Sequence, residues 1–181
     1  MDILVIGDTH FKLNNEEQTN EMCDEIYEVL STNHIDLIIL MGDQLHNHAR
    51  NDTRPIKRLT DFITKLSSKH EVICLVGNHD YINNKQFLTE DHSHYVYKKY
   101  DNITIVDKVI IKRYKNKYNF VFVPFVEPGR FYEALNTIGD KWQNVDMIFA
   151  HQEFKGCFTE NQPPSKVGDS WNIGYPPVIS G

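Results

Sequence analysis

The sequence has little cysteine, no CxxC spacing and no long hydrophobic run. Its 181 residues include only three cysteines, Cys23, Cys74 and Cys157, which are far apart along the chain. An odd and unpatterned set of this kind argues against a disulfide scaffold. It favours a reduced, intracellular protein, which we expect to be cytoplasmic.

The sequence also shows no pattern typical of a targeting segment or a membrane-spanning segment. Met1 is followed directly by a strand-like segment ending at Asp8, with neither a basic region nor a long apolar stretch. We therefore expect no signal peptide and no membrane span. The sequence contains no repeat and no low-complexity tract, and its length suits one domain with a substantial core. We treat residues 1–181 as that single domain.

An overall positive charge is absent too. The formal net charge of −6 excludes a global field that would attract nucleic acid. Charge is unevenly distributed, with acidic residues gathered over 16–28 and basic residues over 98–117. We interpret both runs as solvated faces, and contact of the basic run with a phosphate backbone remains the alternative.

Three segments of the sequence repeat one arrangement, an apolar run that stops at a glycine followed by polar residues. Residues 3–6 lead into GDTH, residues 37–41 into GDQLH, and residues 72–76 into GNHD. Such runs are typical of short buried strands. We expect each glycine to let the backbone turn sharply away from the sheet. Ligand sites of open α/β sheets lie at the carboxyl ends of strands, so the polar side chains should converge there.

Two helices are predicted between these strands. The first runs from Glu16 to about Thr32 after a cap at Asn15, and the second begins after a cap at Thr53. Their apolar faces are expected to be Met22, Ile26, Val29 and Leu30 in the first helix, and Ile56, Leu59, Ile63 and Leu66 in the second. Residues 1–80 thus predict a β-α-β-α-β order with parallel strands and right-handed crossovers.

The periodicity changes after residue 80. Residues 84–94 suggest a short helix or loop carrying His92 and His94, which we interpret, with His48, as surface histidines. Strands are expected at 103–106, 109–111 and 118–123, a helix at 131–138, and a buried strand at 145–150 that ends on His151. Residues 178–181 begin one more strand.

The residues at these strand ends suit a metal centre. Asp8, His10, Asp43, Asn78 and His151 combine carboxylates, imidazoles and an amide, a mixture that favours manganese, iron or zinc over calcium. Two divalent ions about 3.5–4 Å apart are a standard device for phosphoester hydrolysis, because they activate a water and neutralise phosphate charge. His79 would protonate the leaving oxygen. The alternatives are ordinary turn residues after strands and, for His151, a core histidine.

The motifs GDTH, GDQLH, GNHD and AHQ, in this order, resemble the calcineurin-like metallophosphoesterase superfamily. The resemblance covers nearly the whole chain and implies an α/β fold, a two-sheet αββα sandwich whose second sheet is built by the later strands. It also implies that Asp8 and His10 bind the first metal, Asp43 bridges, Asn78 and His151 bind the second, and His79 contacts the scissile phosphate.

The branch of the superfamily is suggested by His46, which stands three residues after Asp43. This spacing resembles the SbcD-type DNA repair exonucleases, and the surrounding sequence resembles phosphoesterases of phages and large DNA viruses. The resemblance implies that His46 helps to orient the substrate, that nucleic acid or another phosphodiester is hydrolysed with two ions, most simply Mn²⁺, and that an ATPase partner and a homodimer are to be expected. Arg130 in PGRF is a candidate phosphate contact, with a surface salt bridge as its alternative.

One departure from the family concerns the end of the sequence. The family's GHxH motif would begin where the sequence reads Ile179-Ser180-Gly181. We therefore expect the last strands to be incomplete, with the C-terminal part missing and the second metal held weakly. Two other functions stay open: a phosphomonoesterase or nucleotide phosphatase, and a catalytically impaired remnant that only binds phosphate or DNA.

Overall fold

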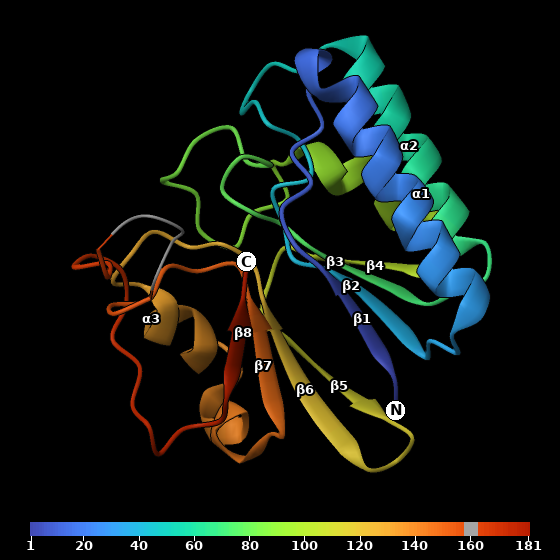
Figure 1. Ribbon diagram of the computed structural model, residues 1–181. Helices are drawn as coiled ribbons and strands as arrows, with labels where there is room; N and C mark the ends of the chain where they lie inside the picture. Colours follow the sequence, from blue (N-terminus) through green and yellow to red (C-terminus); the bar gives the residue numbers. More distant parts are fainter. Residues whose placement is uncertain (158–162) are drawn as a thin grey trace.

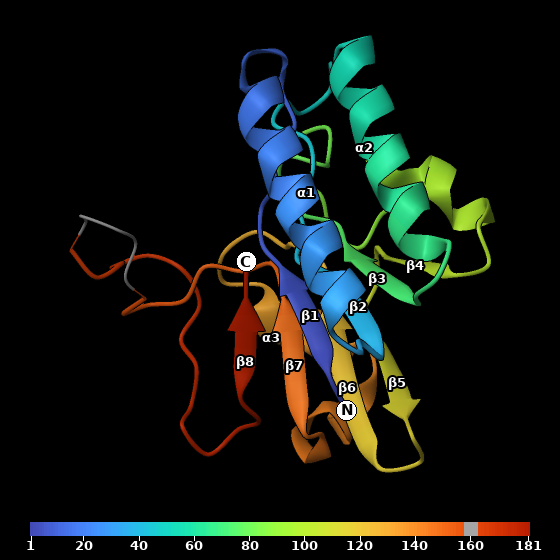
Figure 2. The ribbon, with the colours of Figure 1, turned by 45° about the vertical axis from the view of Figure 1, so that its right-hand side comes forward.

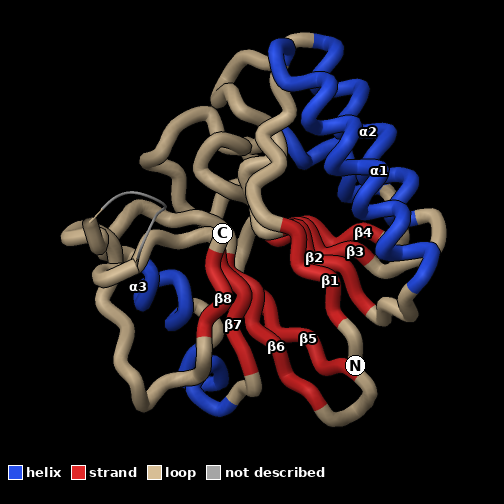
Figure 3. The backbone as a smooth tube through the Cα atoms, in the orientation of Figure 1, coloured by secondary structure: helices blue, strands red, loops and turns tan. Residues whose placement is uncertain are grey.

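The fold consists of two four-stranded sheets packed face to face, with helices on both outer surfaces (Figure 1). The computed structural model describes residues 1–157 and 163–181. Figure 3 shows the two groups of strands lying against each other between the helices. This is the αββα sandwich that the sequence predicted.

The first sheet has the order β1-β2-β3-β4, with all strands parallel. Its strands are β1 (Ile3–Ile6), β2 (Leu37–Leu40), β3 (Val72–Leu75) and β4 (Ile103–Val106). Helices α1 (Glu16–Thr32) and α2 (Thr53–Ser67) cover its outer face, and short 3₁₀ helices lie at Leu13–Asn15 and Ser93–Lys99. The predicted β-α-β-α-β order is confirmed.

The prediction for β4 was wrong, since the later strands were expected to build the second sheet. Ile103 pairs with Val72 and Val106 with Leu75, so this strand extends the first sheet. The connection from residue 76 to residue 102 is long enough for a parallel crossover, and the helix Ser93–Lys99 occupies it.

The second sheet has the order β5-β6-β7-β8. Its strands are β5 (Ile110–Tyr114), β6 (Tyr118–Val123), β7 (Met147–Ala150) and β8 (Val178–Ser180), and only the β5/β6 pair is antiparallel. Helix α3 (Phe131–Asn136) and the 3₁₀ helix Gly139–Asn144 lie on its outer side.

Three apolar layers hold the sandwich together. The middle layer lies between the sheets and includes Leu37, Ile39, Ile73, Phe122 and Phe149, each at most 1 % exposed. Alternate residues of the same strands face outward to the helices, which explains why β2 and β3 read as unbroken apolar runs. The side chains of this middle layer therefore fix the two sheets relative to each other.

Details of the helix predictions need correction. Val29 and Ile56 were placed on buried faces, but they are 39 % and 41 % exposed. Asn15 precedes α1 without capping it, because its side chain accepts the Lys12 N–H and donates to the His10 carbonyl. The residue before α2 is Asp52, and Thr53 is the first residue of the helix.

The basic run over residues 98–117 includes β5 and the turn that leads into β6, and this turn lies at the end of the sandwich away from the loops that follow β1, β2 and β3 (Figure 2). Lys112 pairs with Glu71 at 2.6 Å and Lys115 with Asp36 at 2.8 Å. This supports the interpretation of that run as a solvated, charge-paired face. No helix of the described residues is long and apolar enough to span a bilayer.

Candidate metal centre

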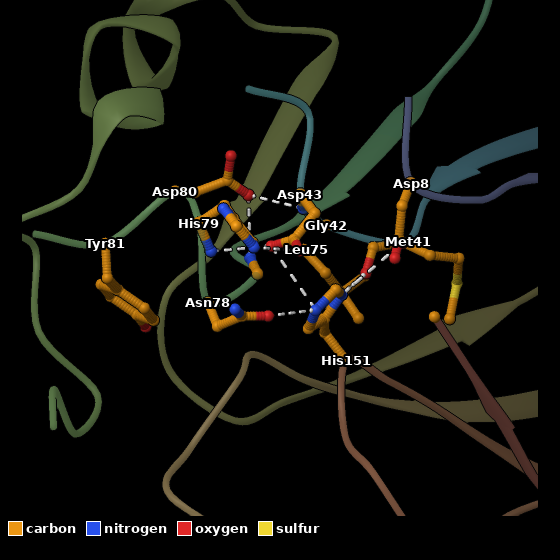
Figure 4. A network of polar contacts seen from close by, with 12 residues as sticks. Asp8, Met41, Gly42, Asp43, Leu75, Asn78, His79, Asp80, Tyr81 and His151 are labelled. Carbon is orange, nitrogen blue, oxygen red and sulfur yellow. Dashed lines mark hydrogen bonds and ion pairs between the residues drawn. The ribbon is translucent and has the colours of Figure 1, made fainter. Parts of the chain in front are cut away.

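The carboxyl ends of β1, β2 and β3 meet at one edge of the first sheet. Ile6 aligns with Leu40, and Leu40 with Cys74, so Asp8, Asp43 and Asn78 follow from neighbouring positions. His151 arrives from the second sheet, directly after β7. The His10 N–H donates to the Asp43 carbonyl at 3.0 Å, which ties the first two loops together. Figure 4 shows Asp43 between the loop of Asn78, His79 and Asp80 and the side chains of His151 and Asp8.

Asp43 lies at the centre of the cluster and is 3 % exposed. Its Oδ2 is 3.8 Å from Nε2 of His10 and 3.8 Å from Nε2 of His79. Its Oδ1 accepts the His79 N–H at 2.8 Å and lies 3.5 Å from Nε2 of His151. The two oxygens of one carboxylate therefore face imidazoles from three different loops.

His151 presents a lone pair to this cluster. Its Nδ1 lies 2.9 Å from the Met41 carbonyl oxygen, which can only accept, so Nδ1 carries the proton. Nε2 faces Asn78 Oδ1 at 3.0 Å and Asp43 Oδ1 at 3.5 Å. In the neutral imidazole this nitrogen and the two oxygens are all acceptors, a set that a cation would stabilise. The donor set fits a divalent metal ion.

A second donor group adjoins the first. Asp8, His10 and Asp43 each offer a ligand atom, and these atoms lie within 4.8 Å of one another. Burial raises the pKa of Asp8, and the nearby Asp43 carboxylate adds to the rise. Burial also lowers the pKa of His10, which favours the neutral imidazole that a metal requires. A bound cation would offset the crowding of the two carboxylates.

Two glycines make this close packing possible. Gly42 has a φ of +110°, and a Cβ on it would lie 2.6 Å from Nδ1 of His151. A Cβ on Gly77 would lie 2.3 Å from both N and Oδ1 of Asp43. Gly7 was expected to act in the same way, but a Cβ there meets nothing within 4 Å and its backbone is not left-handed. His10 and Asp43 adopt φ values of +43° and +51°, so strain is concentrated at this site.

His79 is held by the loop that contains His46 and His48. Its Nδ1–H donates to the His46 carbonyl, which leaves Nε2 facing Asp43. The His79 ring is nearly parallel to those of His46, at 5.5 Å and 14°, and His48, at 4.6 Å and 15°. The structure thus brings His46 to the site, and it adds His48, which sequence reasoning had placed on the surface.

Asp80 and His94 form a buried support that the sequence analysis missed. Asp80 Oδ2 accepts the N–H of Asp43 at 2.8 Å and that of Gly77 at 2.9 Å, while its Oδ1 lies 3.4 Å from His94 Nε2. Burial raises the pKa of Asp80 to about 7 and lowers that of His94 to about 3. The position of Asp80, directly after Asn78 and His79, was the available signal.

The interpretation of His92 and His94 as surface residues was wrong. His94 is fully buried and His92 is 9 % exposed. His92 Nε2 contacts Asp107 Oδ2 at 3.2 Å, so this histidine is held beside the end of β4. The helix Ser93–Lys99 packs against that strand and draws both rings into the core.

The donor groups open into a cleft of about 730 Å³. Lys85, Phe125 and Glu127 contribute to its walls. Gly181 reaches the same place, because a Cβ on it would lie 2.9 Å from Oδ1 of Asp8. Arg130 forms a two-point salt bridge with Glu133 at 2.7 and 2.6 Å. A surface salt bridge was the alternative to a phosphate contact in the sequence analysis. A phosphate contact by Arg130 stays a prediction.

Comparison with known proteins agrees with this geometry. Residues 1–171 match the family model described as calcineurin-like phosphoesterase. The chain belongs to the calcineurin-like phosphoesterase family. The resemblance drawn from its four motifs is thereby confirmed. Calcineurin-like phosphoesterases typically bind divalent metal ions, and the Asp and His groups described above are suitable ligands.

Two viral proteins are similar to this calcineurin-like phosphoesterase. "Putative phosphoesterase 078R" of Invertebrate iridescent virus 3 is 42% identical over 181 residues, which are 99% of this chain and 52% of that protein. "Putative phosphoesterase 244L" of Invertebrate iridescent virus 6 is 44% identical over 180 residues, which are 99% of this chain and 63% of that protein. The chain therefore spans between about half and just under two thirds of these relatives.

Proposed function

We propose that this calcineurin-like phosphoesterase hydrolyses phosphodiesters with two divalent metal ions that share Asp43. The supporting observation is that Oδ2 of Asp43 faces His10 while Oδ1 faces His151. In this proposal Asp8 and His10 complete the first site, and Asn78 and His151 complete the second. The ions, when bound, supply Lewis-acid neutralisation of phosphate charge and an activated water.

The chain's own contribution is to position the phosphate and to deliver a proton. The Nδ1–H of His79 is engaged by the His46 carbonyl, so Nε2 is the atom directed at the reaction. In the proposed step the oxygen of a water bonds to phosphorus and the proton of that water passes to solvent. The phosphorus–oxygen bond to the leaving group breaks, and the leaving oxygen takes a proton from Nε2 of protonated His79, which then regains a proton from solvent. Asn78 and His79 contact the phosphate, and His46 is a positioning residue for the His79 ring.

The proposed substrate class is nucleic acid, cleaved in a nuclease-like manner with Mn²⁺. Its support is the GDQLH spacing, similar to that of SbcD-type DNA repair exonucleases, whereas the names of the viral relatives support phosphoester hydrolysis in general. An ATPase partner and a homodimer belong to the same proposal. A panel with bis-p-nitrophenyl phosphate, single-stranded DNA and a nucleoside monophosphate separates the diesterase from a phosphomonoesterase.

The variant His79→Ala tests the mechanism. We expect hydrolysis of bis-p-nitrophenyl phosphate in Mn²⁺ to fall about 10²–10⁴-fold, while calorimetry shows unchanged Mn²⁺ binding. His34→Ala is the matched control, because the His34 side chain is 80% exposed and contacts only the Asp36 carboxylate among the ion pairs of the described residues. Full activity of His79→Ala would refute the role of His79, and hydrolysis without any added divalent ion would refute the metal mechanism.

A further inference from the structure

A second pocket, of about 440 Å³, opens beside His79. It lies between the loops that follow β2 and β3, and its lining includes His48, Asn51, Tyr81, Ile82, Asp91 and Ser93. His48 belongs to both places, because it lines this pocket and stacks on the His79 ring at 4.6 Å. The pocket is therefore separated from the His79 ring only by the stacked ring of His48.

The charge of the pocket restricts what it can hold. Its described lining contains no lysine or arginine, and it does contain the exposed carboxylate of Asp91. A phosphate placed there would meet negative charge without a compensating cation. The neighbouring cleft differs, since Lys85 and the metal ligands line it. An uncharged group fits the pocket better than a phosphorylated one.

The polar and apolar parts of the pocket suit a nucleoside. His48 offers a planar ring, and Ile82 offers an apolar side chain that is 49% exposed. Asn51 donates its amide N–H groups to the carbonyls of Asn47 and His48, so its Oδ1 is left to accept from a base. Tyr81 Oη, His92 Nδ1 and Ser93 Oγ are buried polar atoms with no hydrogen-bond partner among the described residues. A base in the pocket would stack on the His48 ring and donate to Asn51 Oδ1, above these buried polar atoms.

We propose that this pocket binds the leaving group of the hydrolysed diester and that the preferred leaving group is an uncharged nucleoside. The proposal rests on the phosphodiesterase function proposed above. When the bond from phosphorus to the nucleoside oxygen breaks, that oxygen takes the proton of His79, and the neutral nucleoside remains in the pocket. The phosphorylated product stays in the cleft. The enzyme would then favour linkages next to an unphosphorylated chain end.

Two substrates that share the same dithymidine phosphodiester, with and without terminal phosphates, test this preference. TpT releases an uncharged thymidine whichever phosphorus–oxygen bond breaks, whereas pTpTp releases a phosphorylated nucleoside in either case. We expect kcat/KM to be at least about threefold higher for TpT in the unmodified chain. Ile82→Lys should reduce that ratio about three- to fivefold by adding a cation to the pocket. Ile173→Lys, at a fully exposed isoleucine outside the pocket, is the matched control and should leave the ratio unchanged.

A binding measurement decides the proposal independently of turnover. Thymidine titrated into the metal-free chain should shift the amide resonances of Ile82 and Ser93 without moving the Trp142 indole. An equal or reversed preference for pTpTp, an unchanged ratio in Ile82→Lys, or shifts that spare Ile82 and Ser93 would each overturn the pocket assignment. If bis-p-nitrophenyl phosphate is not hydrolysed in Mn²⁺, the proposed function fails, and the thymidine titration still decides whether the pocket binds a nucleoside.

Discussion

The change Gly77→Ala adds one carbon atom at the point where the loops after β2 and β3 meet. That carbon would lie 2.3 Å from both N and Oδ1 of Asp43, where contacts under 3.0 Å are essentially never seen. Asp43 cannot retreat freely, because its N–H is bonded to Asp80 at 2.8 Å. We expect the variant to lose about 2–4 kcal/mol of stability, from overpacking and a weakened buried hydrogen bond.

The same displacement should impair metal binding, because ligands must be held within about 0.5 Å of their productive geometry. Mn²⁺ titration calorimetry should show at least about a tenfold loss of affinity, alongside the lower midpoint in urea denaturation. Gly7→Ala is the matched control in the sister GDTH motif. Its added carbon meets nothing within 4 Å, so both quantities should change little. Wild-type stability and Mn²⁺ affinity in Gly77→Ala would refute the close packing on which the site is built.

Three further results are expected. Because burial lowers the pKa of His94 to about 3 from 6.5, its unfolded form takes up a proton below pH 6.5, and the contribution of this histidine to stability is lost as pH falls, opposite in sign to the contribution of Asp80. His94→Gln should remove that loss, on the order of 2 kcal/mol in total between pH 7 and pH 5, measured by urea denaturation at the two values. Appending His-Ser-His after Gly181, which lies against Asp8, should raise Mn²⁺ affinity about tenfold over an appended Ala-Ser-Ala. Lys85→Ala should weaken single-stranded DNA binding about threefold or more in a fluorescence titration, while Lys117→Ala, on the distant hairpin, should not.

Sequence reasoning succeeded where a short pattern determines the outcome. Short apolar runs bounded by glycine before Asp8, Asp43 and Asn78 predicted buried strands, and the register of β1, β2 and β3 places their ends together. His151 was also placed correctly, because it directly follows the buried run that forms β7.

What the sequence could not provide depends on long-range packing. Nothing local distinguishes Gly7 from Gly77, since the difference lies in which loop packs against each one. The burial of His92 and His94 depends on how the segment after residue 80 folds back over β4. The stack of His48 on His79 joins two loops that are 31 residues apart in sequence, and no pattern in either loop predicts it.

The central claim is that one carboxylate, Asp43, is shared by two cations. Mn²⁺ binding to the wild-type chain and to Asp43→Asn, followed by calorimetry and electron paramagnetic resonance, tests it most directly. We predict two ions per wild-type chain with exchange-coupled spectra, and loss of affinity at both sites in the variant. If Asp43→Asn keeps one of two sites at full affinity, or if the wild-type chain binds its ions without coupling, the claim is contradicted.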